Sequence, residues 1–235
     1  MASRRSQSSD RSGRNLRVNV RRAKGRTNSS RRWLERQLND PYVADAKRLG
    51  LKSRAAFKLA EIDDEYRFLK PGGVVVDLGA APGGWSQIAA ERVEAVEGKG
   101  AVVAIDLHGM DPLPGVQFLK LDFFEDHAPA AIIEMLGGRR ADVVLSDMAA
   151  HATGHRQTDH LKIMALCESA LDFAGSVLAP GGVFLCKVLR GGTEAALLTA
   201  IKRDFKTVRH VKPKASRDDS AELYVLAMGF RGEGS

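Results

Sequence analysis

One lysine of this sequence stands where a charged side chain is costly, inside an apolar stretch. The stretch is GGVFLCKVL, and the lysine is Lys187. The apolar flanks predict a buried strand, where an ammonium group must be paired or neutral because burying an unpaired charge is unfavourable. Lys187 is therefore either half of a structural ion pair or a group that takes part in proton chemistry.

Carboxylates follow the first four predicted strands, each at the end of an apolar run. They are Asp77, Asp106, Asp122 and Asp147. Parallel strands bring their carboxyl ends to one edge of a sheet, where open α/β folds bind ligands. One Asp at such a place is often only a helix cap, but four in succession indicate a binding edge. Asp147 should also pair with Lys187, because their strands are expected to be neighbours about 4.8 Å apart.

A loop of small residues follows the first strand, in the stretch VVVDLGAAPGGWSQI at residues 74–88. A phosphate-binding P-loop requires Lys and then Ser or Thr after its last glycine, but here Trp85 follows Gly84. A dinucleotide fingerprint requires a further glycine that this loop lacks between Gly79 and Gly83. The loop therefore favours a ligand without phosphate groups.

The carboxylates and the loop together describe that ligand. Asp106, after the second strand, suits ribose hydroxyls, and Asp122, after the third, suits an adenine amino group. A carboxylate near the loop suits a cationic methionine moiety. S-adenosylmethionine is a nucleoside with a positively charged tail, and it is the cofactor that these residues predict.

Short motifs occur in order along the chain: SRAAFKL, DLGAAPGGWSQ, SDMA, LAPGGVFLCKV and, near the end, Ser-Arg and Glu-Leu-Tyr pieces. They closely resemble the motifs of the RlmE/FtsJ-type ribosomal RNA ribose methyltransferases, over the stretch from Arg32 to Gly229. The resemblance implies a catalytic tetrad of Lys58, Asp147, Lys187 and Glu222. It implies cofactor contacts by Gly83, Trp85, Asp106, Asp122 and Asp147, and Gly79 at the start of the turn completes the expected cofactor site.

Lys58 and Glu222 enter the site on the resemblance alone. From its neighbours, Lys58 would be interpreted as a surface lysine whose stem lies along apolar residues. Glu222 would be interpreted as an edge-strand charge that prevents aggregation. The resemblance instead assigns both to the reaction.

The resemblance implies S-adenosylmethionine-dependent 2′-O-methylation of a uridine ribose in 23S rRNA of the large (50S) ribosomal subunit. Lys187 is the expected base for the hydroxyl proton; alternatively it stays charged and orients the hydroxyl. Other functions compatible with the fold are 2′-O-methylation of another RNA, such as tRNA or an mRNA cap, and a non-catalytic role in ribosome assembly. A nicotinamide-dependent dehydrogenase is disfavoured by the glycine loop.

Apolar runs alternate with helical patterns through most of the chain, which predicts an α/β fold. We expect a Rossmann-like class I methyltransferase with a seven-stranded, mostly parallel sheet and helices on both faces. The last two strands should be antiparallel, because only a loop separates them. The expected strands are 74–78, 101–106, 116–121, 141–146, 183–189, 206–212 and 222–230.

The net charge of +7 comes from the beginning of the chain, since residues 1–32 hold eleven Lys and Arg residues and one Asp. Such a segment is typical of a disordered tail that contacts nucleic acid phosphates. The alternatives are a solubilising tail and a mitochondrial transit peptide. Residues 33–235 form the expected methyltransferase domain, in which the helices of 33–70 contribute to RNA binding. The basic candidates are Arg31, Arg32, Lys47, Arg48, Lys52 and Arg54.

Several classes of protein are not expected. No apolar run approaches the ~20 residues that span a bilayer. Cys167 and Cys186 have no metal-type spacing, which favours a reducing compartment. We therefore expect a cytoplasmic protein, or a protein of the mitochondrial matrix if the tail is a transit peptide. The spacing of His151, His155 and His160 does not predict a metal site. For the oligomeric state, we expect a monomer.

Overall fold

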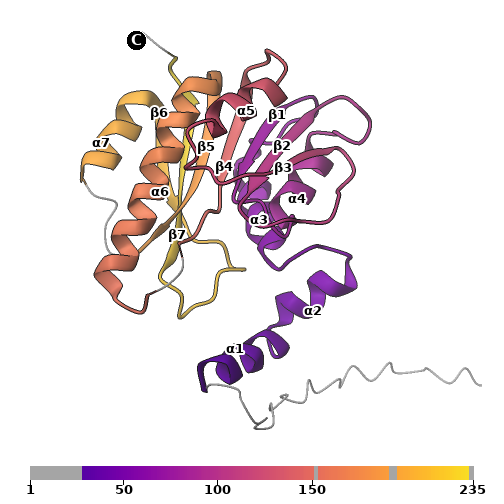
Figure 1. Cartoon of the computed structure of the whole chain (residues 1–235), viewed down its shortest axis with the longest axis vertical. Helices are drawn as coiled ribbons and strands as arrows, with labels where there is room; N and C mark the ends of the chain where they lie inside the picture. Colours follow the sequence, from indigo (N-terminus) through magenta and orange to yellow (C-terminus); the bar gives the residue numbers. More distant parts are fainter. Residues whose placement is uncertain (1–27, 151–152, 191–194, 233–235) are drawn as a thin grey trace, which may run out of the picture. The chain divides into compact units, whose positions relative to one another are not determined.

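The computed structural model describes residues 28–150, 153–190 and 195–232 (Figure 1). It divides into one unit that ends at Ala44 and a second that begins at Asp45. Most of the predicted basic tail lies outside the described residues. In the first unit, helix α1 (Asn28–Leu38) begins inside the range predicted to be tail. Helix α2 (Pro41–Arg48) follows Asp40, whose Oδ1 accepts a hydrogen bond from the Tyr42 amide.

The second unit is built on a seven-stranded sheet in the order β3-β2-β1-β4-β5-β7-β6. The first five strands are parallel, and β7 is antiparallel to both of its neighbours, β5 and β6. The predicted fold is therefore confirmed. The strands are β1 (Val74–Leu78), β2 (Ala101–Asp106), β3 (Val116–Lys120), β4 (Ala141–Ser146), β5 (Leu178–Leu189), β6 (Phe205–Val211) and β7 (Glu222–Phe230).

Helices cover both faces of this sheet (Figure 1). On one face the core contains residues of α3 and α4 packed on the strands, and on the other it contains residues of α5, α6 and α7. These helices are α3 (Ala55–Tyr66), α4 (Gly84–Arg92), α5 (Ala128–Met135), α6 (Arg156–Val177) and α7 (Ala195–Asp204). In the described part of the chain, no helix has the length and hydropathy that a membrane span requires.

The order of the strands creates a switch point between β1 and β4. From β1 the chain builds outward through β2 to β3, and it then returns to add β4 and β5 on the other side of β1. Crossovers that leave a parallel sheet in opposite directions open a crevice at the carboxyl ends of the two strands. The amide of Asp147, just after β4, donates to the carbonyl of Leu78 at the end of β1, 3.1 Å away. The two strand ends therefore define the position of the site.

Candidate active site

A pocket of about 540 Å³ lies at the carboxyl edge of the sheet, around the switch point. Its size is in the range of small-molecule and cofactor sites. Three of the four strand-end carboxylates, Asp106, Asp122 and Asp147, line it together with Gly79. Its apolar lining includes Ile105, Leu107, Leu121, Phe123, Phe124, Met148 and Leu166. The pocket is thus a mostly apolar cavity with three carboxylates, and His108 and Lys162 are its basic lining residues.

Main-chain amides hold two of these carboxylates in place. Asp106 accepts from the amide of Ala81 at 2.9 Å on one oxygen and from that of His108 at 2.7 Å on the other. Asp122 accepts from the amide of Phe124 at 3.0 Å. An ionised carboxylate has about four acceptor sites. Each therefore keeps capacity for a ligand hydroxyl or amino group while its orientation is fixed.

The glycine loop is shaped by close approach of neighbouring backbone. Gly79 has φ +80°, and a Cβ there would lie 2.8 Å from the nitrogen of Met148. Gly83 has φ +105° and precedes the first turn of α4, and a Cβ there would lie 2.7 Å from Leu113 Cδ1. Gly79 lines the pocket, whereas Gly83 is not among its lining residues. A side chain at Gly79 would collide with the loop that carries Asp147.

The side chain of Trp85 lies in the core. Its indole N–H donates to the carbonyl of Ala55 at 2.9 Å, and its ring lies 5.5 Å from that of Tyr224. Only 2% of the residue is exposed, and it is not a lining residue of the pocket. The expected contact of Trp85 with the cofactor stays a prediction that would involve its main chain at the start of α4.

Asp77 differs from the other three strand-end acids because its side chain points into the core. Its Oδ2 accepts from the hydroxyl of Ser86 on α4 at 2.6 Å, and the residue is fully buried. Burial raises the pKa of this carboxyl to about 7, and the hydrogen bond from Ser86 opposes that rise. The sequence grouped four acids at the edge, but only three of them line the pocket.

The predicted pair of Lys187 and Asp147 is confirmed. The ammonium nitrogen of Lys187 lies 3.1 Å from Asp147 Oδ1 and also donates to the main-chain carbonyl of Asp147. A second pair joins Lys58 on α3 to Glu222 at the start of β7, with 2.6 Å between Nζ and Oε1. Lys58 is only 8% exposed, which contradicts its interpretation as a surface lysine. The four expected tetrad residues therefore form two ion pairs.

Tyr224 connects these two pairs, and the sequence did not point to it. Its hydroxyl lies 3.1 Å from Asp147 Oδ1 and 3.4 Å from Lys58 Nζ. Burial, and then the charges of Asp147 and Glu222, raise its pKa well above the usual value, so the phenol keeps its proton and donates to Asp147. A signal was available, because Tyr224 is two residues after Glu222 in β7 and therefore shares its face of the sheet.

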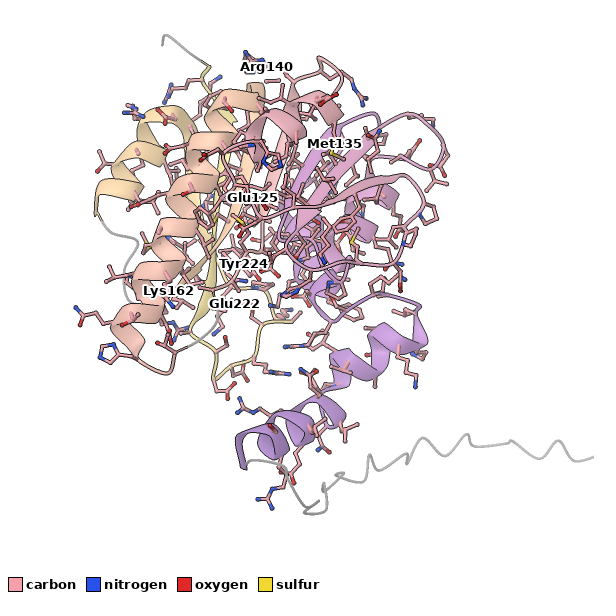
Figure 2. All side chains as sticks on the ribbon, viewed as in Figure 1. Glu125, Met135, Arg140, Lys162, Glu222 and Tyr224 are labelled. Carbon is pink, nitrogen blue, oxygen red and sulfur yellow. The ribbon has the colours of Figure 1, made fainter. Side chains whose placement is uncertain are left out.

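Glu222 is ionised despite being largely buried. Burial raises the pKa of its carboxyl, but the charge of Lys58 and hydrogen bonds from Lys58 and Ser216 outweigh burial and lower the pKa overall. Figure 2 labels Glu222 and Tyr224 at one end of the sheet, opposite the end where Arg140 precedes β4. The tetrad and the pocket thus share the carboxyl edge, and Asp147 belongs to both.

The histidine triplet does not come together as a described cluster. His151 lies outside the described residues. His155 caps α6, where its Nδ1 accepts from the amide of Thr158 at 3.4 Å. Among the described residues, no three potential metal ligands gather.

The basic residues expected to bind RNA occupy different places. Lys47 and Arg48 are exposed at the end of α2, where Arg48 lies 3.1 Å from Asp45. Lys52 lies 3.1 Å from Asp111, and Arg54 donates to the carbonyl of Ala215. In the first unit, Arg31 and Arg32 belong to α1.

Comparisons with known proteins agree with this geometry. Residues 51–230 match the FtsJ-like methyltransferase family. A protein of Xanthobacter autotrophicus named "Ribosomal RNA large subunit methyltransferase E" is 63% identical over 94% of this chain and 87% of its own length. A protein of the same name from Parvibaculum lavamentivorans is 64% identical over 92% of this chain and 88% of its own length. A Plasmodium falciparum crystal structure, described as a ribosomal RNA methyltransferase, has a TM-score of 0.68 and 32% identity over 77% of this chain and 99% of its own.

Proposed function

This chain belongs to the FtsJ-like methyltransferase family, and from that premise we propose that it methylates the 2′-hydroxyl of a uridine ribose in 23S rRNA of the large ribosomal subunit. The observation that carries the proposal is the Lys187–Asp147 pair, 3.1 Å apart, at the rim of a carboxylate-lined pocket. The names of the relatives support ribosomal RNA of the large subunit as the substrate.

The pocket fits S-adenosylmethionine, the methyl donor that we propose. Asp106 and Asp122 would accept from the ribose hydroxyls and the adenine amino group, while the apolar wall would pack on the adenine. The carboxylate of Asp147 would favour the cationic end of the ligand. A cofactor with phosphates would meet three carboxylates, and the glycine loop supplies no basic residue, although Lys162 and His108 also line the pocket. S-adenosylmethionine supplies a methyl group activated by its sulfonium.

The protein's own residues would orient the ribose hydroxyl and handle its proton. The amine of Lys187 would lie against the hydroxyl oxygen, either removing its proton or orienting it while charged. Asp147 would hold Lys187 through the observed bond, and Lys58 and Glu222 would complete the wall around the sugar. Alignment of this kind can contribute ~7–11 kcal/mol to a transfer between two bound groups.

Two other functions remain testable alternatives. Another RNA, such as tRNA or an mRNA cap, could present the same 2′-hydroxyl, and a ribosome assembly factor could use the fold without catalysis. We favour catalysis because both ion pairs are formed. We further propose that the protein acts as a monomer in the cytoplasm, or in the mitochondrial matrix if the basic tail of residues 1–32 is a transit peptide.

The deciding experiment offers undermethylated large subunits and S-adenosylmethionine with a labelled methyl group to the full chain, and then maps the labelled nucleotide. We expect one labelled uridine in 23S rRNA, lost with Lys187→Ala although calorimetry still detects cofactor binding. If only tRNA or only a capped transcript became labelled, the substrate would be that RNA and not 23S rRNA. A Lys187→Ala variant with unchanged turnover would exclude the role assigned to Lys187.

A further inference from the structure

The loop between β6 and β7, residues 212–221, is fixed to α3 next to the expected tetrad. We propose that Ser216 in this loop and Glu61 on α3 are positioning residues that hold the Lys58–Glu222 pair in its working geometry. This inference rests on the proposed function, because it assumes that Lys58 and Glu222 serve methyl transfer.

Ser216 contacts the tetrad directly. Its hydroxyl donates to Glu222 Oε1 at 2.9 Å, the same oxygen that lies 2.6 Å from Lys58 Nζ. Only 3% of Ser216 is exposed, so water does not readily replace this bond. One carboxylate oxygen is thus held between an ammonium and a hydroxyl from two different segments. The hydroxyl leaves the carboxylate fewer orientations than the ion pair alone would.

A single face of α3 holds the loop that carries Ser216. Lys58 and Glu61 are three residues apart on α3, and Arg54, its N-cap residue, is four residues before Lys58, so all three lie on one side of the helix. Arg54 donates to the carbonyl of Ala215, and Glu61 Oε2 accepts from the amide of Ala215 at 2.9 Å. Ala215 is fully buried, with its amide bonded to α3 and its carbonyl bonded to Arg54, the N-cap residue of α3. The residue before Ser216 is therefore fixed on the helix that carries Lys58.

The loop is also closed by bonds of its own. Lys212 Nζ donates to the carbonyl of Ser220 at 2.8 Å, and the amide of Ser216 donates to the carbonyl of Pro213 at 2.9 Å. The hydroxyl of Ser220 accepts from the amide of Glu222 at 3.2 Å. The loop is therefore a folded connection that delivers Glu222 to α3.

These contacts matter because Glu222 is the first residue of β7. Without the bond from Ser216, the side chain of Glu222 would still be held by the ion pair with Lys58 but could adopt more orientations. The Lys58–Glu222 pair could then break and re-form in several rotamers, and Lys58 would lose its fixed place beside Tyr224. Small displacements of positioned groups lower the rate of a step that depends on alignment, without changing how tightly the substrates bind. A positioning role therefore predicts a loss in kcat rather than in KM.

The test compares matched variants of the full chain, with large subunits as substrate. Ser216→Ala and Glu61→Ala each remove one holding bond, and we expect kcat to fall about three- to tenfold, as for the loss of one buried hydrogen bond. KM for the subunit and for S-adenosylmethionine should stay within about twofold, since neither residue touches a ligand in this scheme. Ser216→Thr and Glu61→Gln keep the donor and the acceptor, and they should restore most of kcat.

Ser176→Ala is the control, because Ser176 donates to the carbonyl of Phe173 far along α6 and has no contact with the tetrad. If Ser216→Ala and Glu61→Ala match this control in kcat, the inference is wrong. It is also wrong if both raise KM for the subunit alone, since the loop would then be an RNA contact. If Ser216→Ala fails to fold, the comparison of kcat between Glu61→Ala and Glu61→Gln tests the inference instead, because only the first variant removes the acceptor for the Ala215 amide. Active Lys187→Ala would instead contradict the proposed function.

Discussion

The hydroxyl of Tyr224 lies 3.1 Å from Asp147 Oδ1, so a phenol joins the carboxylate that serves both the pocket and Lys187. The same hydroxyl lies 3.4 Å from Lys58. These contacts form one continuous chain across α3, β7, the end of β4 and β5. Its members, in order, are Glu222, Lys58, Tyr224, Asp147 and Lys187. A change at its centre should affect both ion pairs.

Tyr224→Phe removes that central hydroxyl and keeps the ring that packs on Trp85. We expect kcat to fall about fivefold, because Asp147 loses one donor and Lys187 becomes less well fixed. The measurement is turnover on large subunits, together with calorimetry of cofactor binding, which should be unchanged. Unchanged turnover would show that the two ion pairs act independently, whereas weaker cofactor binding would show that Tyr224 shapes the pocket.

The sequence predicted the parallel core well because its signals are local. Apolar runs that end in Asp or Gly mark β1, β2 and β4 at their observed bounds. The Lys187–Asp147 pair followed from adjacency, since both strands were expected to be parallel neighbours.

Other features depend on tertiary contacts that sequence patterns do not encode. The loop before β7 predicted an antiparallel pair but not that β7 enters between β5 and β6. Asp77 resembles its neighbours in sequence, yet it shares a face of β1 with Val75 and so points towards α4. Tyr224, in an apolar strand, looks like an ordinary core residue, and α1 is too polar to give a helical apolar pattern.

Gly79→Ala should weaken both folding and cofactor binding. A Cβ at this position would lie 2.8 Å from the nitrogen of Met148, in addition to the strain of φ +80°. The matched control is Gly98→Ala, which has φ +73° but no atom within 4 Å of the new Cβ. Strain alone costs about 1–2 kcal/mol, so we expect Gly79→Ala to lose more stability than Gly98→Ala in denaturant titrations. Equal losses would show that the loop relaxes around the methyl group.

Asp77→Asn should change how stability depends on pH. Burial raises the pKa of Asp77 to about 7, against about 4 in the unfolded chain, so the folded state binds the proton more tightly. The contribution of this raised pKa to the free energy of unfolding is complete below pH 4. It is lost as the pH rises to 7, so the free energy of unfolding falls by an amount on the order of 4 kcal/mol. Asn does not titrate, so this loss should disappear from the variant.

The measurement is the free energy of unfolding of both proteins in urea between pH 4 and pH 8 without cofactor. We expect the wild type to lose stability relative to Asp77→Asn as the pH rises through this window. Asp142→Asn is a control, because Asp142 is exposed and accepts from the amide of Val74 at the other end of β1. A constant difference between wild type and Asp77→Asn at all pH values would mean that the pKa of Asp77 is the same in the folded and the unfolded chain.

Deleting residues 1–27 should weaken RNA binding and reduce its dependence on salt. These residues contain nine of the eleven Lys and Arg residues of the tail and its one acid, and the deletion leaves α1 intact. Each phosphate contact that is lost reduces the slope of log K against log salt concentration by about 0.7 to 0.9. The slope is measured by titrating the full chain and the truncated chain onto large subunits at several salt concentrations. Turnover at saturating subunit should be unchanged, because the tetrad is retained, and an unchanged salt slope would show that the tail does not bind RNA.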